Sequence, residues 1–191
     1  MKKLALALAL STIFMAGAAS AVEQDNAHGM TIYGRLETAK SGCTVLMSKY
    51  VINLSHDDKY LPNQGDKLGN VQADDHIFVQ LGGENCDANE NYSKIGLKFL
   101  GTADNILGTS LANTDTASDA ATGIGVQLSN IKSELMVPNV TVANFPGSTV
   151  INNSTDKTAS FPLYFTLVKL QGQEATPGNV QTNLTVQIER L

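Results

Sequence analysis

Tryptophan is absent from this chain of 191 residues, and aromatic residues make up only 6% of it. Basic residues are also scarce, with 13 lysines and arginines against 18 acidic residues. Because nucleic-acid binding needs clustered basic side chains to neutralise phosphates, this balance argues against a nucleic-acid partner. The lack of tryptophan also weighs against a sugar-binding surface built on aromatic stacking.

Long apolar runs are missing as well, and the longest one lies at the N-terminus. Lys2 and Lys3 precede an apolar stretch that ends near Met15, and residues 19–21 are small. This pattern is typical of a secretory signal peptide, whereas a membrane-spanning helix needs about 20 apolar residues. The sequence therefore predicts a signal peptide over residues 1–21 and an exported chain without a membrane span.

The predicted mature chain begins at Val22 and keeps 170 of the 191 residues. A chain of this length fits one domain with a hydrophobic core of its own. Because Lys2 and Lys3 are lost with the signal peptide, 11 basic residues remain against 18 acidic ones, a net charge of −7. We therefore expect a single acidic domain.

Cysteine occurs only at positions 43 and 86, and the chain has no Cys-x-x-Cys pair. An even number of cysteines in an exported protein is expected to form disulfides, so we predict a bond between Cys43 and Cys86. In the chain-entropy model a bond across this separation contributes roughly 4 kcal/mol to stability. A zinc site or a redox pair would need closer cysteine spacing or nearby histidines.

Helical periodicity is nearly absent, whereas apolar and polar residues alternate in short runs bounded by Gly, Asn, Asp and Pro. Such alternation predicts β-strands with one buried face. In the run nearest the C-terminus, Val180, Leu184, Val186 and Ile188 share one face. The runs cover residues 77–81, 95–99, 124–128, 163–167 and 180–188, and polar connectors are predicted over 57–70, 105–121 and 152–160. This arrangement predicts an all-β sandwich of the immunoglobulin type.

Catalytic motifs are missing from the chain: it has no Gly-x-Ser-x-Gly elbow, no phosphate-binding glycine-rich loop and no His-Glu-x-x-His. Residues 56–58 and 74–76 each combine one histidine with two aspartates, which are potential metal ligands. Solvated polar loops explain both clusters more simply. We therefore expect no enzymatic activity, no cofactor and no metal.

Several motifs occur in a fixed order along the predicted mature chain. They are Ile32-Tyr33-Gly34-Arg35-Leu36, Cys43-Thr44-Val45, Phe78-Val79-Gln80-Leu81 before Cys86, the Phe-x-Gly-Thr turn within residues 95–104, Gly-Ile-Gly-Val-Gln-Leu over 123–128, and Pro177-Gly178-Asn179-Val180. Their joint order resembles that of the type 1 fimbrial family, the pilins of the chaperone–usher pathway. The resemblance covers nearly all of the predicted mature chain.

This resemblance implies an immunoglobulin-like β-sandwich that lacks its final strand. In the family, a donor strand from a periplasmic pilus chaperone, and later from a neighbouring pilin subunit, completes the sandwich. The resemblance thus implies a structural subunit of a fimbrium on the cell surface, which contributes to adhesion and is assembled at an outer-membrane usher. Main-chain hydrogen bonds would supply affinity, and alternate side chains would fill pockets.

The resemblance also implies roles for particular residues. The donor arm would be Val22–Tyr33, with Met30 and Ile32 as anchors and Gly29 at a close-packed position. The sandwich domain would cover residues 34–191, and its acceptor groove would include three residues near the C-terminus, Leu184, Val186 and Ile188.

Other interpretations of the same residues stay open. The arm can also be a terminus without fixed structure, and the C-terminal run can be an ordinary strand of a complete sandwich. The whole chain would then be a self-contained secreted module that binds a glycan or another host ligand. A two-domain tip adhesin is disfavoured, because 170 of the 191 residues do not readily hold a lectin domain and a pilin domain.

Overall fold

The computed structural model describes residues 30–33, 43–56, 60–67, 76–83, 94–146, 148–150 and 158–191. All the regular elements in these ranges are β-strands, which confirms the predicted all-β class. The strands are β1 (Met30–Tyr33), β2 (Thr44–Met47), β3 (His76–Gly82), β4 (Ile95–Leu100), β5 (Leu111–Ala112), β6 (Ile124–Ser129), β7 (Val142–Asn144), β8 (Ser148–Val150), β9 (Thr158–Lys169), β10 (Val180–Asn183) and β11 (Thr185–Arg190).

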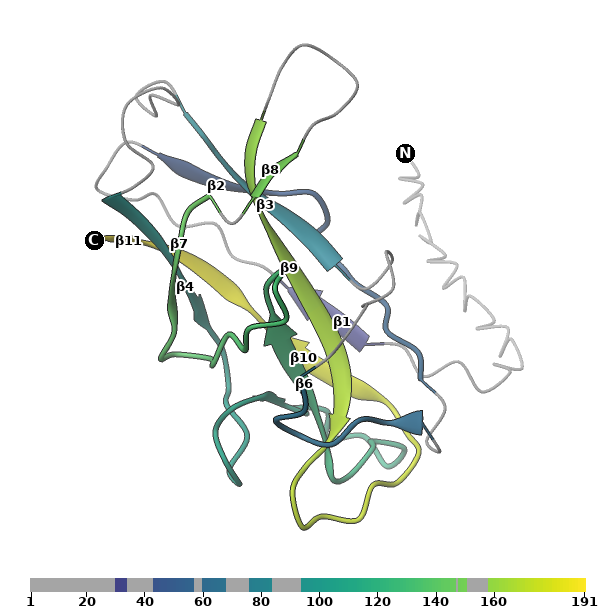
Figure 1. The fold of residues 1–191 in the computed structure, drawn as a ribbon. Coiled ribbons are helices and arrows are strands. Elements are labelled where there is room, and N and C mark those ends of the chain that lie inside the picture. The colour runs from purple at the N-terminus through teal and green to yellow at the C-terminus, as the bar shows by residue number, and fades with distance from the viewer. Residues whose placement is uncertain are drawn as a thin grey trace, which may run out of the picture.

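The strands form two main sheets (Figure 1). One has the order β2-β3-β9-β6-β5, with β8 paired to β9, and the other has the order β11-β4-β7. Every pairing within these two sheets is antiparallel. A third, two-stranded sheet pairs β1 with β10 in parallel. The parallel pair joins the start of the described chain to its C-terminal part.

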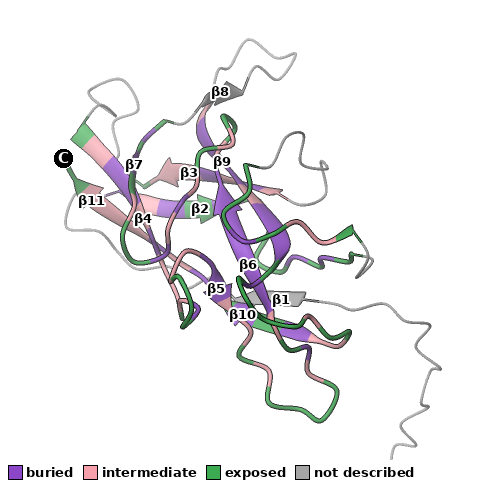
Figure 2. Cartoon of the chain, turned by 60° about the horizontal axis from the view of Figure 1, so that its bottom comes forward, coloured by how far each residue is buried: buried purple, intermediate pink, exposed green. Residues whose placement is uncertain are grey.

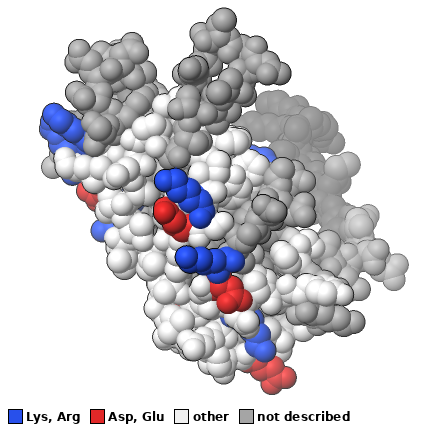
Figure 3. Space-filling model, viewed as in Figure 1, with Lys and Arg blue, Asp and Glu red and all other residues white. Residues whose placement is uncertain are grey.

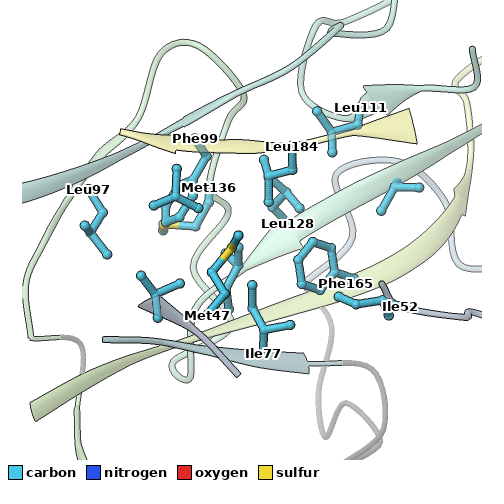
Figure 4. Packing of buried hydrophobic residues seen from close by; sticks show 14 of the residues in the cluster. Met47, Ile52, Ile77, Leu97, Phe99, Leu111, Leu128, Met136, Phe165 and Leu184 are labelled. Carbon is cyan, nitrogen blue, oxygen red and sulfur yellow. The ribbon is translucent and has the colours of Figure 1, made fainter. Parts of the chain in front are cut away.

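The hydrophobic core lies between the two main sheets. Val79 on β3 and Leu128 on β6 face Leu97 and Phe99 on β4, and all four side chains are fully buried. The rings of Phe99 and Phe161 meet across the sandwich with centroids 5.6 Å apart. Figure 4 labels core side chains from both sheets, among them Phe99 on β4 and Leu128 on β6. Alternation of apolar residues on strands of both sheets therefore builds a single core.

β9 begins earlier than the sequence predicts, because residues 158–160 belong to it and not to a connector. Thr158 and Ser160 pair with β8. This pairing makes them part of a strand, whereas their polar side chains predicted a connector. Pro162 is tolerated within the strand, since the backbone groups of Phe78 opposite it bond to Ser48 instead. The predicted connector over 105–121 likewise contains β5.

β6 is buried on both faces, although its alternation predicted only one buried face (Figure 2). Gln127 shows the reason: its amide donates to the carbonyl oxygen of Asp66 at 3.0 Å and accepts from the N–H of Gly65 at 2.8 Å. The segment at residues 60–67 is thereby held close to β6. Gly123 precedes the strand with φ 65°, and a Cβ there would collide with the carbonyl oxygen of Glu174. Gly123 and Gln127 both belong to the Gly-Ile-Gly-Val-Gln-Leu motif over residues 123–128.

Candidate strand-exchange site

The C-terminal strand pair, β10 and β11, is separated only by Leu184 and keeps one alternation throughout. The even-numbered side chains of Val180, Thr182, Leu184 and Val186 are buried, and Ile188 is half-buried. The odd-numbered positions Gln181 and Asn183 are exposed. The predicted face of the strand is therefore confirmed, with Thr182 as an additional member.

The odd-numbered residues direct their backbone groups toward the body of the domain. Asn179 donates to the carbonyl oxygen of Asp119 at 2.8 Å, and the carbonyl oxygen of Gln181 accepts from Thr114 at 2.7 Å. Further along, the N–H of Leu191 donates to the carbonyl oxygen of Lys94 at 2.9 Å, in line with the β11–β4 pairing. This backbone edge is thus paired at Asn179, at Gln181 and along β11.

The even-numbered residues must direct their N–H and C=O groups to the opposite edge, because these groups alternate along a strand. We call the part of this edge formed by Val186, Ile188 and Arg190 the acceptor edge. β11 is the outermost strand of its sheet, and no strand in the described ranges pairs with its acceptor edge. The acceptor edge is therefore the place where a further strand can be added.

The N-terminal arm already occupies the neighbouring part of the same edge. β1 runs parallel to β10, with Met30 opposite Val180 and Ile32 opposite Thr182. The structure therefore brings the two predicted anchors to the C-terminal strand, but next to Val180 and Thr182 and not next to the predicted acceptor residues. The rest of the predicted arm, including Gly29, lies outside the described residues.

The predicted acceptor residues form an apolar floor beside the acceptor edge. Leu184 and Val186 are each 1% exposed and belong to the core, whereas Ile188 packs against the core from the margin. In Figure 4, Leu184 extends from the C-terminal strand toward Leu128 on β6. A strand added here would lie directly against the hydrophobic core.

Gly101 lets β4 approach the junction of β10 and β11. A Cβ at this position would lie 2.6 Å from the carbonyl oxygen of Asn183 and 2.5 Å from Leu111 Cδ2. Real Cβ atoms do not come that close to backbone atoms, so any larger residue would push the strands apart. The glycine of the Phe-x-Gly-Thr motif thereby sets the position of the C-terminal strand, a role that the motif alone did not reveal.

Asp104 fixes the loop that follows this turn. Its carboxylate accepts hydrogen bonds from the backbone N–H groups of Ile106, Leu107 and Ser110, each at 2.9 Å, and from Gln64 Nε2 at 2.8 Å. Burial alone would raise the pKa of Asp104, but these hydrogen bonds outweigh it and hold the pKa below its ordinary value. The loop is therefore a rigid support at the end of β4.

Other predicted features are only partly covered by the described residues. Cys43 is buried at 5% exposure, but Cys86 lies outside the described residues, so the disulfide stays a prediction. Asp57, Asp58, Asp74 and Asp75 also lie outside them. Charged side chains on the face shown in Figure 3 are few and of mixed sign. The described part of the chain contains no helix that could span a membrane.

A family model described as fimbrial protein matches residues 30–189, which is most of the chain. The chain belongs to the fimbrial protein family. It is accordingly a structural, non-enzymatic subunit of a chaperone–usher fimbria, located on the cell surface and involved in adhesion. Membership also implies the incomplete immunoglobulin-like sandwich that the resemblance suggested. No curated protein matches the chain.

Proposed function

We propose that this fimbrial subunit accepts a β-strand from another polypeptide at its acceptor edge and donates its own arm, Val22–Tyr33, to the next subunit. The observation that carries this proposal is the alternation of the C-terminal strand, which turns the backbone groups of Val186, Ile188 and Arg190 toward an edge that no described strand occupies. Strand addition satisfies such groups and covers the apolar residues beside them.

The pairing of β1 with β10 supports the donor role of the arm. Met30–Tyr33 form a regular strand against the same edge of the C-terminal strand to which a donor would add. The segment is thus compatible with strand pairing at this edge. In a fibre, the arm would leave its own domain and pair with the C-terminal strand of a neighbouring subunit.

The partners follow from the order of export. A signal peptide over residues 1–21 would direct the chain to the periplasm, where a pilus chaperone would supply the first strand. At the outer-membrane usher, the arm of another pilin subunit would replace the chaperone strand. A Cys43–Cys86 disulfide would restrain the sandwich during these steps, and the burial of Cys43 is compatible with such a role.

Two experiments test separately whether the subunit accepts a foreign strand and whether it donates its own arm. Val186→Asp places a charge on the floor beside the acceptor edge and is expected to abolish co-purification with the chaperone, because an unpaired charge is strongly disfavoured there. Gln187→Asp is the matched control, since Gln187 is the next residue on the same strand and lies on the other face. Equal chaperone binding by both variants would contradict the acceptor assignment.

Deletion of residues 22–33 tests donation. The deleted subunit is expected to bind the chaperone but to be missing from assembled fibres, which immunoblots of sheared fibres from a strain carrying only this variant would measure. Normal incorporation would contradict the donor assignment. A self-contained binding module would instead purify as a stable monomer without any chaperone, a result that size-exclusion chromatography with mass spectrometry would reveal.

A further inference from the structure

Thr182 is an unusual residue in the middle of the C-terminal strand. Its side chain is completely buried, and its Oγ1 atom has no hydrogen-bond partner. The other inward positions on the same face, Val180, Leu184, Val186 and Ile188, are all apolar. A buried hydroxyl without a partner lowers stability, so an aliphatic residue at position 182 would suit this chain better if the chain acted alone.

The residue that now stands opposite Thr182 cannot satisfy its hydroxyl. In the parallel pairing of β1 with β10, Ile32 occupies that position, and an isoleucine side chain carries no hydrogen-bonding atom. The chain's own arm thus leaves a polar group unpaired on the strand that it covers. This mismatch is confined to one position, because the other inward residue opposite β1 is Val180.

We propose that Thr182 is a specificity-determining residue that selects a donor strand carrying a serine or threonine at the position opposite it. This inference rests on the proposed function, since it concerns the strand that replaces the chain's own arm. Residues directly opposite one another on neighbouring strands lie close enough for their hydroxyl groups to bond. A donor with a hydroxyl at this position pairs the Thr182 hydroxyl, whereas the chain's own arm does not, and the difference favours exchange.

The first experiment uses the full chain and compares Ile32→Thr with Ile32→Val, two substitutions of equal size that differ in the hydroxyl. The readout is amide hydrogen exchange at Thr182, which reports release of the arm. Ile32→Thr is expected to slow exchange about fivefold relative to Ile32→Val, and the difference is expected to vanish in the Thr182→Val background. Thr185→Val is the matched control, because Thr185 lies on the opposite face and the difference should survive there.

The second experiment adds labelled peptides of residues 22–33 to the full chain, with threonine or valine placed in turn at positions 30, 31, 32 and 33. A preference for threonine at one position, lost in Thr182→Val, supports the inference. Peptides that bind without such a preference overturn it and leave the proposed function intact. If no peptide displaces the arm, the proposed acceptance of a foreign strand is what fails, and the comparison within the chain still decides the role of Thr182.

Discussion

Replacement of Asp104 by alanine is expected to destabilise the domain by about 2 to 5 kcal/mol. The carboxylate serves the buried N–H of Ser110 and the amide of Gln64, and both would lose a partner that water cannot easily replace. A buried donor left unpaired lowers stability by about 1 to 3 kcal/mol. The N–H groups of Ile106 and Leu107 lie nearer the surface and can recover water, so they add less.

Asp104→Asn refines this prediction. An asparagine oxygen can still accept from Ile106 and Leu107, but its NH2 group would then face the donors of Ser110 and Gln64. We therefore expect a loss comparable to that of the alanine variant, although the asparagine has nearly the same shape as the aspartate.

Guanidinium unfolding of the purified chain, followed by circular dichroism, measures both variants. Asp115→Asn is the matched control, because Asp115 accepts a single exposed hydrogen bond from Ala117 that an asparagine can keep. Its effect should stay within about 0.5 kcal/mol. If Asp104→Ala and Asp104→Asn also stayed within that limit, the hydrogen bonds of Asp104 would not support the loop as inferred.

The remaining predictions concern pH, the glycine turn and the predicted disulfide. Because the folded-state pKa of Asp104 is lowered, the Asp104 carboxylate contributes fully to the free energy of unfolding above about pH 4, and this contribution is lost as the pH falls through the folded-state pKa. The difference in unfolding free energy between the native chain and Asp104→Asn should therefore shrink in acid. A difference that stays constant with pH would refute this. Gly101→Val should reduce the yield of folded subunit far more than Gly65→Val. A Cβ at Gly65 meets no atom within 4 Å, although the φ of 88° at Gly65 adds some strain. Equal periplasmic yields of the two variants would contradict the close approach of Gly101 to Asn183. Cys43→Ser should also lower the yield of folded subunit, and an unchanged yield would count against a structural disulfide.

The sequence predicted the strands whose alternation is regular. The runs over 77–81, 95–99 and 124–128 lie within β3, β4 and β6, and the run over 180–188 spans most of β10 and β11. These strands carry large apolar residues on the core side, so local pattern and tertiary burial agree on that side, although β6 is buried on its other face as well. For them, periodicity was a sufficient guide.

The strands that the sequence did not predict have patterns that contradict their environment. In β2, Val45, Leu46 and Met47 are all apolar, so the sequence shows no alternation, although Leu46 is 44% exposed between two buried neighbours. In β7, Val142 is 39% exposed while the smaller Ala143 is buried, so the apolar signal points to the wrong face. β5 has only two residues and depends on its pairing with β6. Tertiary contacts, which a local pattern does not encode, decide these elements.

The apolar face of the C-terminal strand was predicted from the sequence, but its backbone pairing was not. Leu184, Val186 and Ile188 were recognised from their alternation, whereas the pairing of β1 with β10, and hence the position of Thr182 opposite Ile32, depends on a contact between distant parts of the chain. Thr182 was overlooked because a threonine interrupts the apolar series. Its importance follows only from its burial and its unpaired hydroxyl.

The most direct test of the account is residue-resolved hydrogen exchange, measured by NMR on the labelled full chain before and after addition of a purified pilus chaperone. The amides of Thr185, Gln187 and Glu189 face β4 and should be protected in both samples. The amides of Val186, Ile188 and Arg190 should become protected only after the chaperone binds. If the chaperone bound while these three amides exchanged as before, the acceptor edge would not be the site of strand addition.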